Sequence, residues 1–189
     1  ATDYSVASRT MMFDQRARTW SEWIAEQAGI DIGIMSPPFP SGTRVGSVTE
    51  AAAAETGLPK GTPVVTGGHD HLCGAFASGI VTPGSILDST GTAEALLTPT
   101  NAFRADEHLR AGGYSCYCHV APNTYVVQGG LTIAGGLVDW LVGLLWPRHN
   151  DTQAIGSYDA AFREAALSPV GARGLCWLPL AMPGTPTND

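Results

Sequence analysis

The sequence is poor in charged residues, above all in positive ones. Only 14% of the 189 residues are charged, 10 bases stand against 17 acids, and the net charge is −7. No run of lysines or arginines occurs anywhere in the chain. Without a basic patch the chain has no electrostatic footprint for nucleic acid or for an anionic membrane surface, so neither role is supported. A bound polyanion would need help from backbone N–H groups or from a metal ion.

Long apolar runs and cysteine motifs are missing as well. The longest apolar stretch, residues 137–146, is too short to span a membrane and carries Asp139. No secretory signal is visible, and none of the four cysteines forms a C-x-x-C pair of the redox or zinc-knuckle type. We therefore expect a reduced, cytoplasmic protein. Because the chain starts at Ala1 rather than at a methionine, we also expect an internal piece of something longer.

The apolar content points to a folded α/β protein. Hydrophobic residues make up 44% of the chain, enough for a sizeable core, and the length fits one average domain or parts of two. Short helices are predicted at 21–29 and 49–57, each opened by a Ser or Thr cap and ended by glycine. Residues 62–68 read as a buried strand ending in a Gly turn, and 70–80 as the helix that follows.

The pattern changes after a "GIVTPG" stretch at residues 79–84, where we place a domain boundary. Beyond it the sequence predicts two strands within 85–100 joined at "STGTAE" and a hairpin within 112–130 that turns at Pro122–Asn123. These are followed by a long apolar helix at 132–146 that ends at Pro147, an amphipathic helix at 157–167 and a closing buried strand at 174–182.

The stretch "TPVVTGGHDHLCGAF" holds several residues with reactive or metal-binding side chains close together. His69 and His71 flank Asp70, and on one continuous strand the two histidines would share a face and could bind zinc, with Cys116, Cys118 or His119 as a further ligand. The Gly pair argues against a continuing strand, which leaves a plain polar turn or a functional Asp70. A carboxylate at the end of a strand suits general-base work on a hydroxyl, and we favour that interpretation, with no metal between the histidines.

Three further segments can be interpreted either as purely structural or as functional. "DSTGTAE", residues 88–94, is a small hydroxyl-rich turn that fits an anion but is common in hairpins. Gly135 and Gly136 open an apolar helix and serve either close helix packing or a flat surface for a nucleotide. Residues 2–10 are polar and small, and on physical grounds alone they predict a loop.

Taken in order, these segments resemble the middle of an FGGY-family carbohydrate kinase. The likeness covers nearly the whole chain and rests on five stretches whose order and spacing agree with the family: "TDYSVASRTMMFDQRARTW", "TGLPKGTPVVTGGHDHLCGAFASGIVTPG", "DSTGTAEALL", "GGLTIAGGLVDWL" and "GLCWLPLAMPGTPTND". The resemblance implies an α/β fold of two ribonuclease-H-like lobes of the actin and hexokinase type, here incomplete. Residues 1–80 would be the end of the first lobe and 81–189 the start of the second.

The resemblance also implies the reaction, which is ATP-dependent phosphorylation of a hydroxyl on a small sugar or polyol, with Mg²⁺ alongside the phosphates. Asp70 would be the general base and lie against the substrate. The other implied contacts are His71 with the substrate, Gly91 and Thr92 with phosphate, and Gly135 and Asp139 with the nucleotide. Asp70 and Thr92 should then face one cleft.

Several features depart from the family pattern. Val6 stands where the family usually has Asn, "MPGTP" replaces its G-E-R-x-P, and no D-x-G-T phosphate loop or Gly-rich adenine segment is present. We therefore expect the isolated chain to be inactive, with apolar faces that lack cover and favour association, a homodimer included. The competing hypotheses are a zinc-binding domain built on the histidines and the Cys116–His119 cluster, or an inactive structural fragment.

Overall fold

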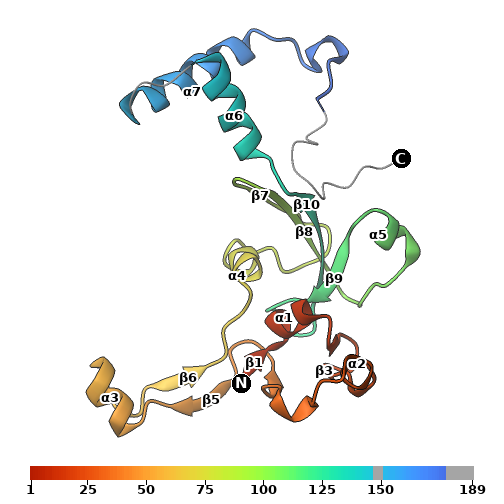
Figure 1. Cartoon of the computed structure of the whole chain (residues 1–189), viewed down its shortest axis with the longest axis vertical. Helices are drawn as coiled ribbons and strands as arrows, with labels where there is room; N and C mark the ends of the chain where they lie inside the picture. The colour runs from red at the N-terminus through yellow and green to blue at the C-terminus, as the bar shows by residue number, and fades with distance from the viewer. Residues whose placement is uncertain (147–150, 178–189) are drawn as a thin grey trace. The chain divides into compact units, whose positions relative to one another are not determined.

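The computed structural model describes residues 1–146 and 151–177 (Figure 1). Most of its helices and strands are short. In chain order they are β1 Thr2–Asp3, α1 Tyr4–Ala7, η1 Ser8–Thr10, β2 Phe13–Asp14, β3 Thr19–Trp20, α2 Glu22–Ala28, η2 Ile32–Ile34, β4 Pro38–Phe39, β5 Arg44–Ser47, α3 Glu50–Thr56, β6 Pro63–Val65, α4 Asp70–Ala77, β7 Leu87–Thr90, β8 Glu94–Thr100, α5 Glu107–Ala111, β9 Ser115–Cys118, β10 Tyr125–Leu131, α6 Gly135–Leu145, α7 Asp151–Ala166 and η3 Ala172–Gly174.

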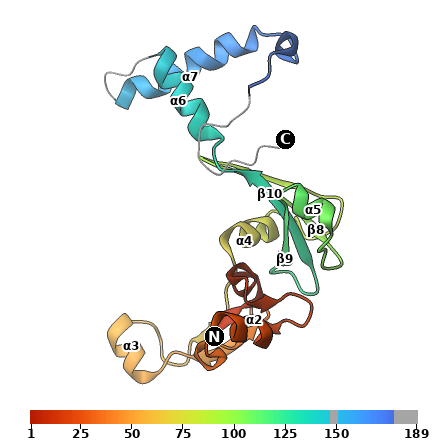
Figure 2. The ribbon, with the colours of Figure 1, turned by 45° about the vertical axis from the view of Figure 1, so that its right-hand side comes forward.

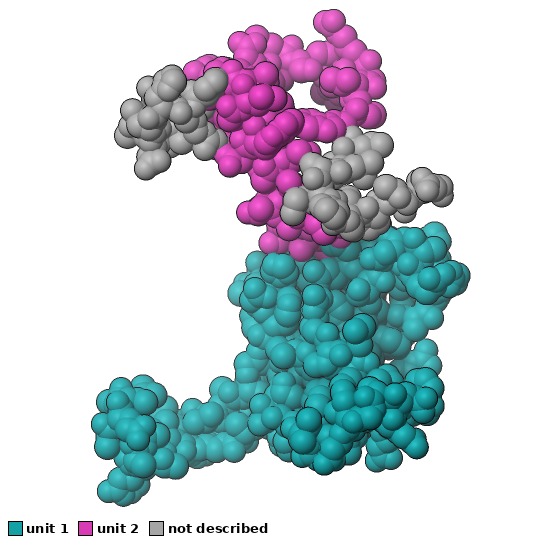
Figure 3. Space-filling view, in the orientation of Figure 1, with its two compact units in different colours: residues 1–87, 97–129 teal, residues 88–96, 130–189 magenta. Residues whose placement is uncertain are grey.

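The chain divides into two compact units (Figure 3). Unit 1 comprises residues 1–87 and 97–129, and unit 2 comprises 88–96 and 130–189. Each unit is made of two separate segments of the chain, so this division does not test the predicted lobe boundary near residues 80–84. That boundary stays a prediction.

The largest sheet has the strand order β7-β8-β10-β9. β9 and β10 pair antiparallel, with Cys118 opposite Tyr125, and the predicted turn at Pro122–Asn123 connects them. Asn123 has a φ of 55°, a left-handed conformation that Asn tolerates better than most residues. β7 and β8 are neighbours joined by residues 91–93, as the sequence predicted.

The core of unit 1 joins its N-terminal segment to this hairpin. Ala7 and Phe13 from the N-terminus are buried with Cys118 and Tyr125, and the Phe13 and Trp20 rings meet edge to face with centroids 5.6 Å apart. Edge-to-face aromatic pairs add to the gain from burying apolar area. The N-terminal segment is thereby held against β9 and β10.

The predicted helix caps are confirmed. The Ser21 hydroxyl accepts the Ile24 N–H at the start of α2, and the Thr49 hydroxyl accepts the Ala52 N–H at the start of α3. Each cap satisfies a backbone donor that the first turn of a helix leaves unpaired. Both helices end at a glycine in the left-handed region, which a residue without Cβ adopts at no steric cost.

The prediction of a buried strand before the Gly turn is only half right. β6 forms, but it pairs antiparallel with β5 in a two-stranded sheet. Val64 is 43% exposed and Val65 is 54% exposed, because this sheet has no packing layer over them among the described residues. Trp140 of unit 2 is 56% exposed. The sequence predicted that apolar faces at Val64, Val65, Leu137 and Trp140 lack part of their cover. The three exposed residues agree with this prediction, whereas Leu137 is half-buried.

In the described part of unit 2, the α-helices α6 and α7 lie side by side (Figure 2). Both were predicted, and α7 begins at residue 151, earlier than the sequence indicated. The expected helix stop at Pro147 lies outside the described residues. The predicted closing strand is not present at residues 174–177, where Leu175 and Trp177 are exposed, and its remainder lies outside the described residues. Within residues 1–146 and 151–177, no helix combines the length and apolarity that a membrane crossing requires.

Candidate functional site

The turn that leads into α4 is fixed by close packing at Gly68. A Cβ at this position would lie 2.3 Å from Val120 Cγ1, in the loop between β9 and β10, and 3.0 Å from Cys73 Sγ on α4, so a larger residue would displace the turn or these side chains. His69 then adopts extended backbone as the cap residue, and α4 begins at Asp70. Sequence reasoning predicted this turn into a helix, and it is confirmed.

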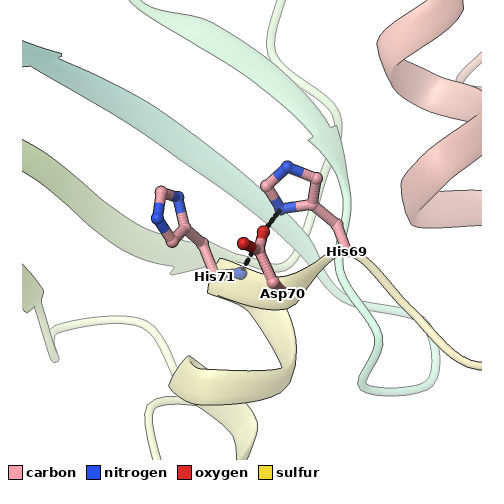
Figure 4. Close-up of side chains that lie close together, drawn as sticks. All are labelled: His69, Asp70 and His71. Carbon is pink, nitrogen blue, oxygen red and sulfur yellow. Dashed lines mark hydrogen bonds and ion pairs between the residues drawn. The ribbon is translucent and has the colours of Figure 1, made fainter. Parts of the chain in front are cut away.

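Asp70 lies in the first turn of α4, with its carboxylate between the rings of His69 and His71 (Figure 4). Its side chain is 84% exposed, and Oδ1 accepts a 2.8 Å hydrogen bond from the His71 N–H. That bond is the main reason why the pKa of Asp70 lies below its ordinary value, and the two histidines lower it further. The carboxylate is therefore ionised at neutral pH, as a general base must be.

The two histidines stand on either side of this carboxylate. Their ring centroids are 5.6 Å apart at 71°, and His69 Nδ1 lies 3.3 Å from Asp70 Oδ1. Burial lowers the pKa of His69, with Asp70 opposing the shift, so His69 is neutral at pH 7. Nδ1 of His71 is buried without a hydrogen-bond partner among the described residues, whereas His69 Nδ1 has the Asp70 carboxylate at 3.3 Å. Buried polar atoms are seldom left in this state, and a bound ligand or water would complete them.

These three side chains could offer ligand atoms to a metal ion, since one atom from each lies within 4.8 Å of the others. The surrounding charges, however, act on a cation in both directions. The N-terminal, positive end of α4 and the charge of Arg9 oppose a cation at His69, whereas the charge of Asp70, which acts on His69 more strongly than that of Arg9, favours one. The expectation of no metal between the histidines therefore stays a prediction.

The wider zinc cluster of the competing hypothesis is not assembled. Cys116 Sγ accepts the Arg104 N–H, and His119 Nδ1 accepts the Ala121 N–H. Burial raises the pKa of the Cys116 and Cys118 thiols, which disfavours the thiolate that zinc binds. In the described part of the chain, neither cysteine nor His119 joins the histidine group.

In unit 2, the turn between β7 and β8 is held by the start of α6. The Gly91 carbonyl accepts the Gly135 N–H at 2.9 Å, and the Thr92 carbonyl accepts the Ala134 N–H at 2.7 Å. Thr92 itself is exposed. The Gly135 N–H is thus engaged by the turn, so the structure gives this glycine a packing role beside the nucleotide contact that the resemblance implied.

Gly135 is required by that close approach, because a Cβ there would lie 2.4 Å from the Gly91 carbonyl oxygen. We expect Gly135→Ala to destabilise unit 2 by about 1–3 kcal/mol, as overpacking does. Gly143→Ala in the same helix is the control, because nothing lies within 4 Å of its Cβ position. That change should stabilise the helix by about 0.5–1 kcal/mol. Urea denaturation of the 189-residue chain measures both, and equal shifts for the two variants would contradict the packing role.

Asp139 lies one turn after Gly135 on α6, and the Tyr158 hydroxyl of α7 donates a 2.7 Å hydrogen bond to its Oδ1. It lines an open groove with Trp140, Gly143 and Leu144. Its predicted nucleotide contact is not tested by this geometry. Asp70 and His71 belong to unit 1, while the four predicted phosphate and nucleotide residues belong to unit 2. The single cleft shared by Asp70 and Thr92 therefore stays a prediction.

Sequence reasoning missed the N-terminal segment, whose predicted loop is wrong. Residues 2–10 form β1, α1 and η1. Asp3 caps α1 by accepting the Ser5 and Val6 N–H groups, and Ser5 is fully buried. The Asp three residues before Val6 is an N-cap signal that could have been read from the sequence.

Known proteins agree with this architecture. Residues 1–77 match the N-terminal domain of the FGGY family of carbohydrate kinases. The xylulose kinase of Bacillus subtilis is 31% identical over 94% of this chain and 34% of its own length, and an Enterobacter autoinducer-2 kinase is 41% identical over 49% of this chain and 17% of its own length. The chain thus spans about a third of the length of the curated xylulose kinases that it matches.

Solved structures extend the match to nearly the whole chain. The xylulose kinase of Rhodospirillum rubrum superposes with a TM-score of 0.80 and 31% identity, over 95% of this chain and 35% of that one. The gluconate kinase of Lactobacillus acidophilus, at 18% identity and a TM-score of 0.80, shares the fold over 94% of this chain and 34% of its own. The predicted fold class is confirmed as part of the two-lobed actin- and hexokinase-type α/β fold. The chain belongs to the FGGY family of carbohydrate kinases.

Proposed function

We propose that the complete protein carrying this chain transfers the γ-phosphoryl group of ATP to a hydroxyl of a small sugar, with Asp70 as general base. The observation that carries the proposal is the exposed, ionised Asp70 carboxylate at the start of α4. It takes the proton of the attacking hydroxyl as the new P–O bond forms and ADP leaves. Phosphoryl transfer needs little else from a protein besides positioning and electrostatic support.

The substrate side of the proposed site is built from the two histidines. His71 has a buried Nδ1 without a hydrogen-bond partner among the described residues, which a sugar hydroxyl would complete, while His69 Nδ1 lies beside the Asp70 carboxylate. Several relatives of this chain are xylulose kinases. We therefore propose a ketopentose as the first substrate to test, with His71 as a direct contact and His69 beside it.

The phosphate side is the β7–β8 turn. An exposed Thr92 hydroxyl next to Gly91 offers a donor and a close backbone approach to a phosphate oxygen. Asp88 raises the pKa of Glu94 on the same hairpin, which shows that negative charge is concentrated there. ATP would bring Mg²⁺, whose charge offsets this repulsion and supports the phosphates.

All four cysteines are free thiols, as expected in a reducing compartment. We therefore propose a location in the cytoplasm, where ATP is abundant. Association of the chain through its uncovered apolar faces, with a homodimer as the simplest form, remains part of the same proposal.

The proposal is tested by incubating the complete protein with γ-labelled ATP and a panel of acceptors. The panel contains xylulose, gluconate, glycerol and autoinducer-2, because the related proteins are named for them. We expect one labelled sugar phosphate per ADP formed, with xylulose the best acceptor. Label released only as inorganic phosphate, independent of any acceptor, would contradict a sugar kinase.

A further inference from the structure

The turn that presents Asp70 is tied to a residue far away in the sequence. The His69 N–H, at the cap of α4, donates a 2.8 Å hydrogen bond to the Ser5 hydroxyl oxygen, 64 positions earlier. This bond joins α1 to the N-terminus of α4 within unit 1. The residue after His69 is Asp70, so the bond fixes the backbone directly before the proposed base.

The Ser5 hydroxyl is in turn oriented by Asp3. It donates to Asp3 Oδ2 at 2.6 Å, and with its proton committed there, its lone pairs are left for the His69 N–H. Asp3 is only 4% exposed and Ser5 is fully buried. A hydrogen bond to an ionised acceptor is among the stronger kinds, and burial strengthens it.

The Asp3 carboxylate is otherwise saturated. Besides the hydroxyl, Oδ2 accepts the Ser5 N–H at 2.8 Å and the Ser41 hydroxyl at 2.8 Å, and Oδ1 accepts the Val6 N–H at 3.1 Å. A buried carboxylate is costly unless its lone pairs are occupied, and here four donors occupy them. Neither oxygen can rotate without losing donors, so the direction of the Ser5 hydroxyl is set.

We propose that Asp3 and Ser5 are positioning residues for the base, acting through the hydrogen-bonded chain Asp3–Ser5–His69 N–H. This inference rests on the proposed function, since it concerns how Asp70 is aimed. The chain holds the start of α4 in one place, so Asp70 keeps its bond to the His71 N–H and meets the substrate hydroxyl in one orientation. Small displacements of a reacting group are costly in rate, which gives the chain a role in turnover as well as in folding.

The test compares Ser5→Ala with Ser8→Ala in the complete protein. Ser8 is a matched control, because it lies in the same segment, is buried, and its hydroxyl bonds to the Tyr4 carbonyl and Gln15 instead of the turn. We expect Ser5→Ala to lower kcat about ten-fold with little change in the KM for ATP. Ser8→Ala should lose comparable thermal stability but keep kcat.

Two further readouts separate positioning from stability. In Ser5→Ala the His71–Asp70 bond loosens and the pKa of Asp70 rises toward its ordinary value, so the acid limb of the kcat/KM profile moves to higher pH. Amide exchange at His69 should also accelerate in Ser5→Ala and not in Ser8→Ala. If Ser5→Ala does not fold, Ser5→Cys replaces it, because the thiol keeps a weak donor and acceptor at that site. We expect the kcat of Ser5→Cys to be about two-fold to ten-fold lower than that of the wild type.

The outcomes distinguish this inference from the proposed function. If Asp70→Asn keeps full turnover, the base assignment is wrong. If Asp70→Asn loses turnover but the Ser5 variant matches Ser8→Ala in kcat, in pH profile and in His69 exchange, the base stands and the positioning role is overturned. The positioning role is supported if only the Ser5 variant shows a lowered kcat, an acid limb shifted to higher pH and faster amide exchange at His69.

Discussion

Replacing Asp70 by asparagine is expected to lower kcat for sugar phosphorylation by about 10²- to 10⁴-fold in the complete protein. Asparagine keeps the shape of the side chain and an oxygen that can accept the His71 N–H bond seen at Oδ1. It cannot take a proton at neutral pH, so only the base function is lost. The KM for ATP should change little, because Asp70 belongs to the substrate side of the proposed site.

Asp106→Asn is the matched control for this variant. Asp106 caps α5 in the same unit, and its pKa is likewise lowered by a backbone hydrogen bond, from the Leu109 N–H. The same substitution there should leave kcat unchanged, because asparagine is also a good cap residue. Steady-state rates of ADP formation measure both variants. Near-normal turnover of Asp70→Asn would remove this residue from the mechanism.

Thr92→Val is expected to weaken the transition state for phosphoryl transfer by about 1.5–3 kcal/mol, the usual cost of losing a hydrogen bond to a charged group. Valine keeps the branched shape of the exposed Thr92 side chain and removes its hydroxyl. The loss should appear in kcat, with the KM for the sugar unchanged, because the proposed contact is to a phosphate oxygen.

Thr100→Val at the other end of β8 is the control for this change. Its hydroxyl donates to the Ala102 carbonyl and lies outside the proposed site. We expect its kcat to match that of the wild type. A Thr92 variant in which the sugar KM rises while kcat stays level would contradict the phosphate role.

Local signals were sufficient for most elements of the fold. Ser21 and Thr49 cap their helices and glycines end them, since each motif is complete within about ten residues. The β9–β10 hairpin likewise follows from the turn at Pro122–Asn123 between two alternating runs. The turn that delivers Asp70 into α4 was predictable for the same reason.

Features that depend on distant contacts could not be predicted. The bond from His69 N–H to Ser5 spans 64 positions, and nothing in the local sequence of either residue indicates its partner. The burial expected at β6 failed for a related reason. An apolar strand is buried only if the same chain supplies a covering layer, and Val64 and Val65 lack one among the described residues.

The most direct measurement is a crystal structure of the complete protein with its sugar and a non-hydrolysable ATP analogue. We expect an Asp70 carboxylate oxygen about 2.6–3.2 Å from one sugar hydroxyl, with that hydroxyl in line with the γ-phosphate and the Thr92 hydroxyl bonded to a phosphate oxygen. A complex in which the sugar hydroxyl nearest the γ-phosphate meets another base, with Asp70 turned to solvent, would contradict it.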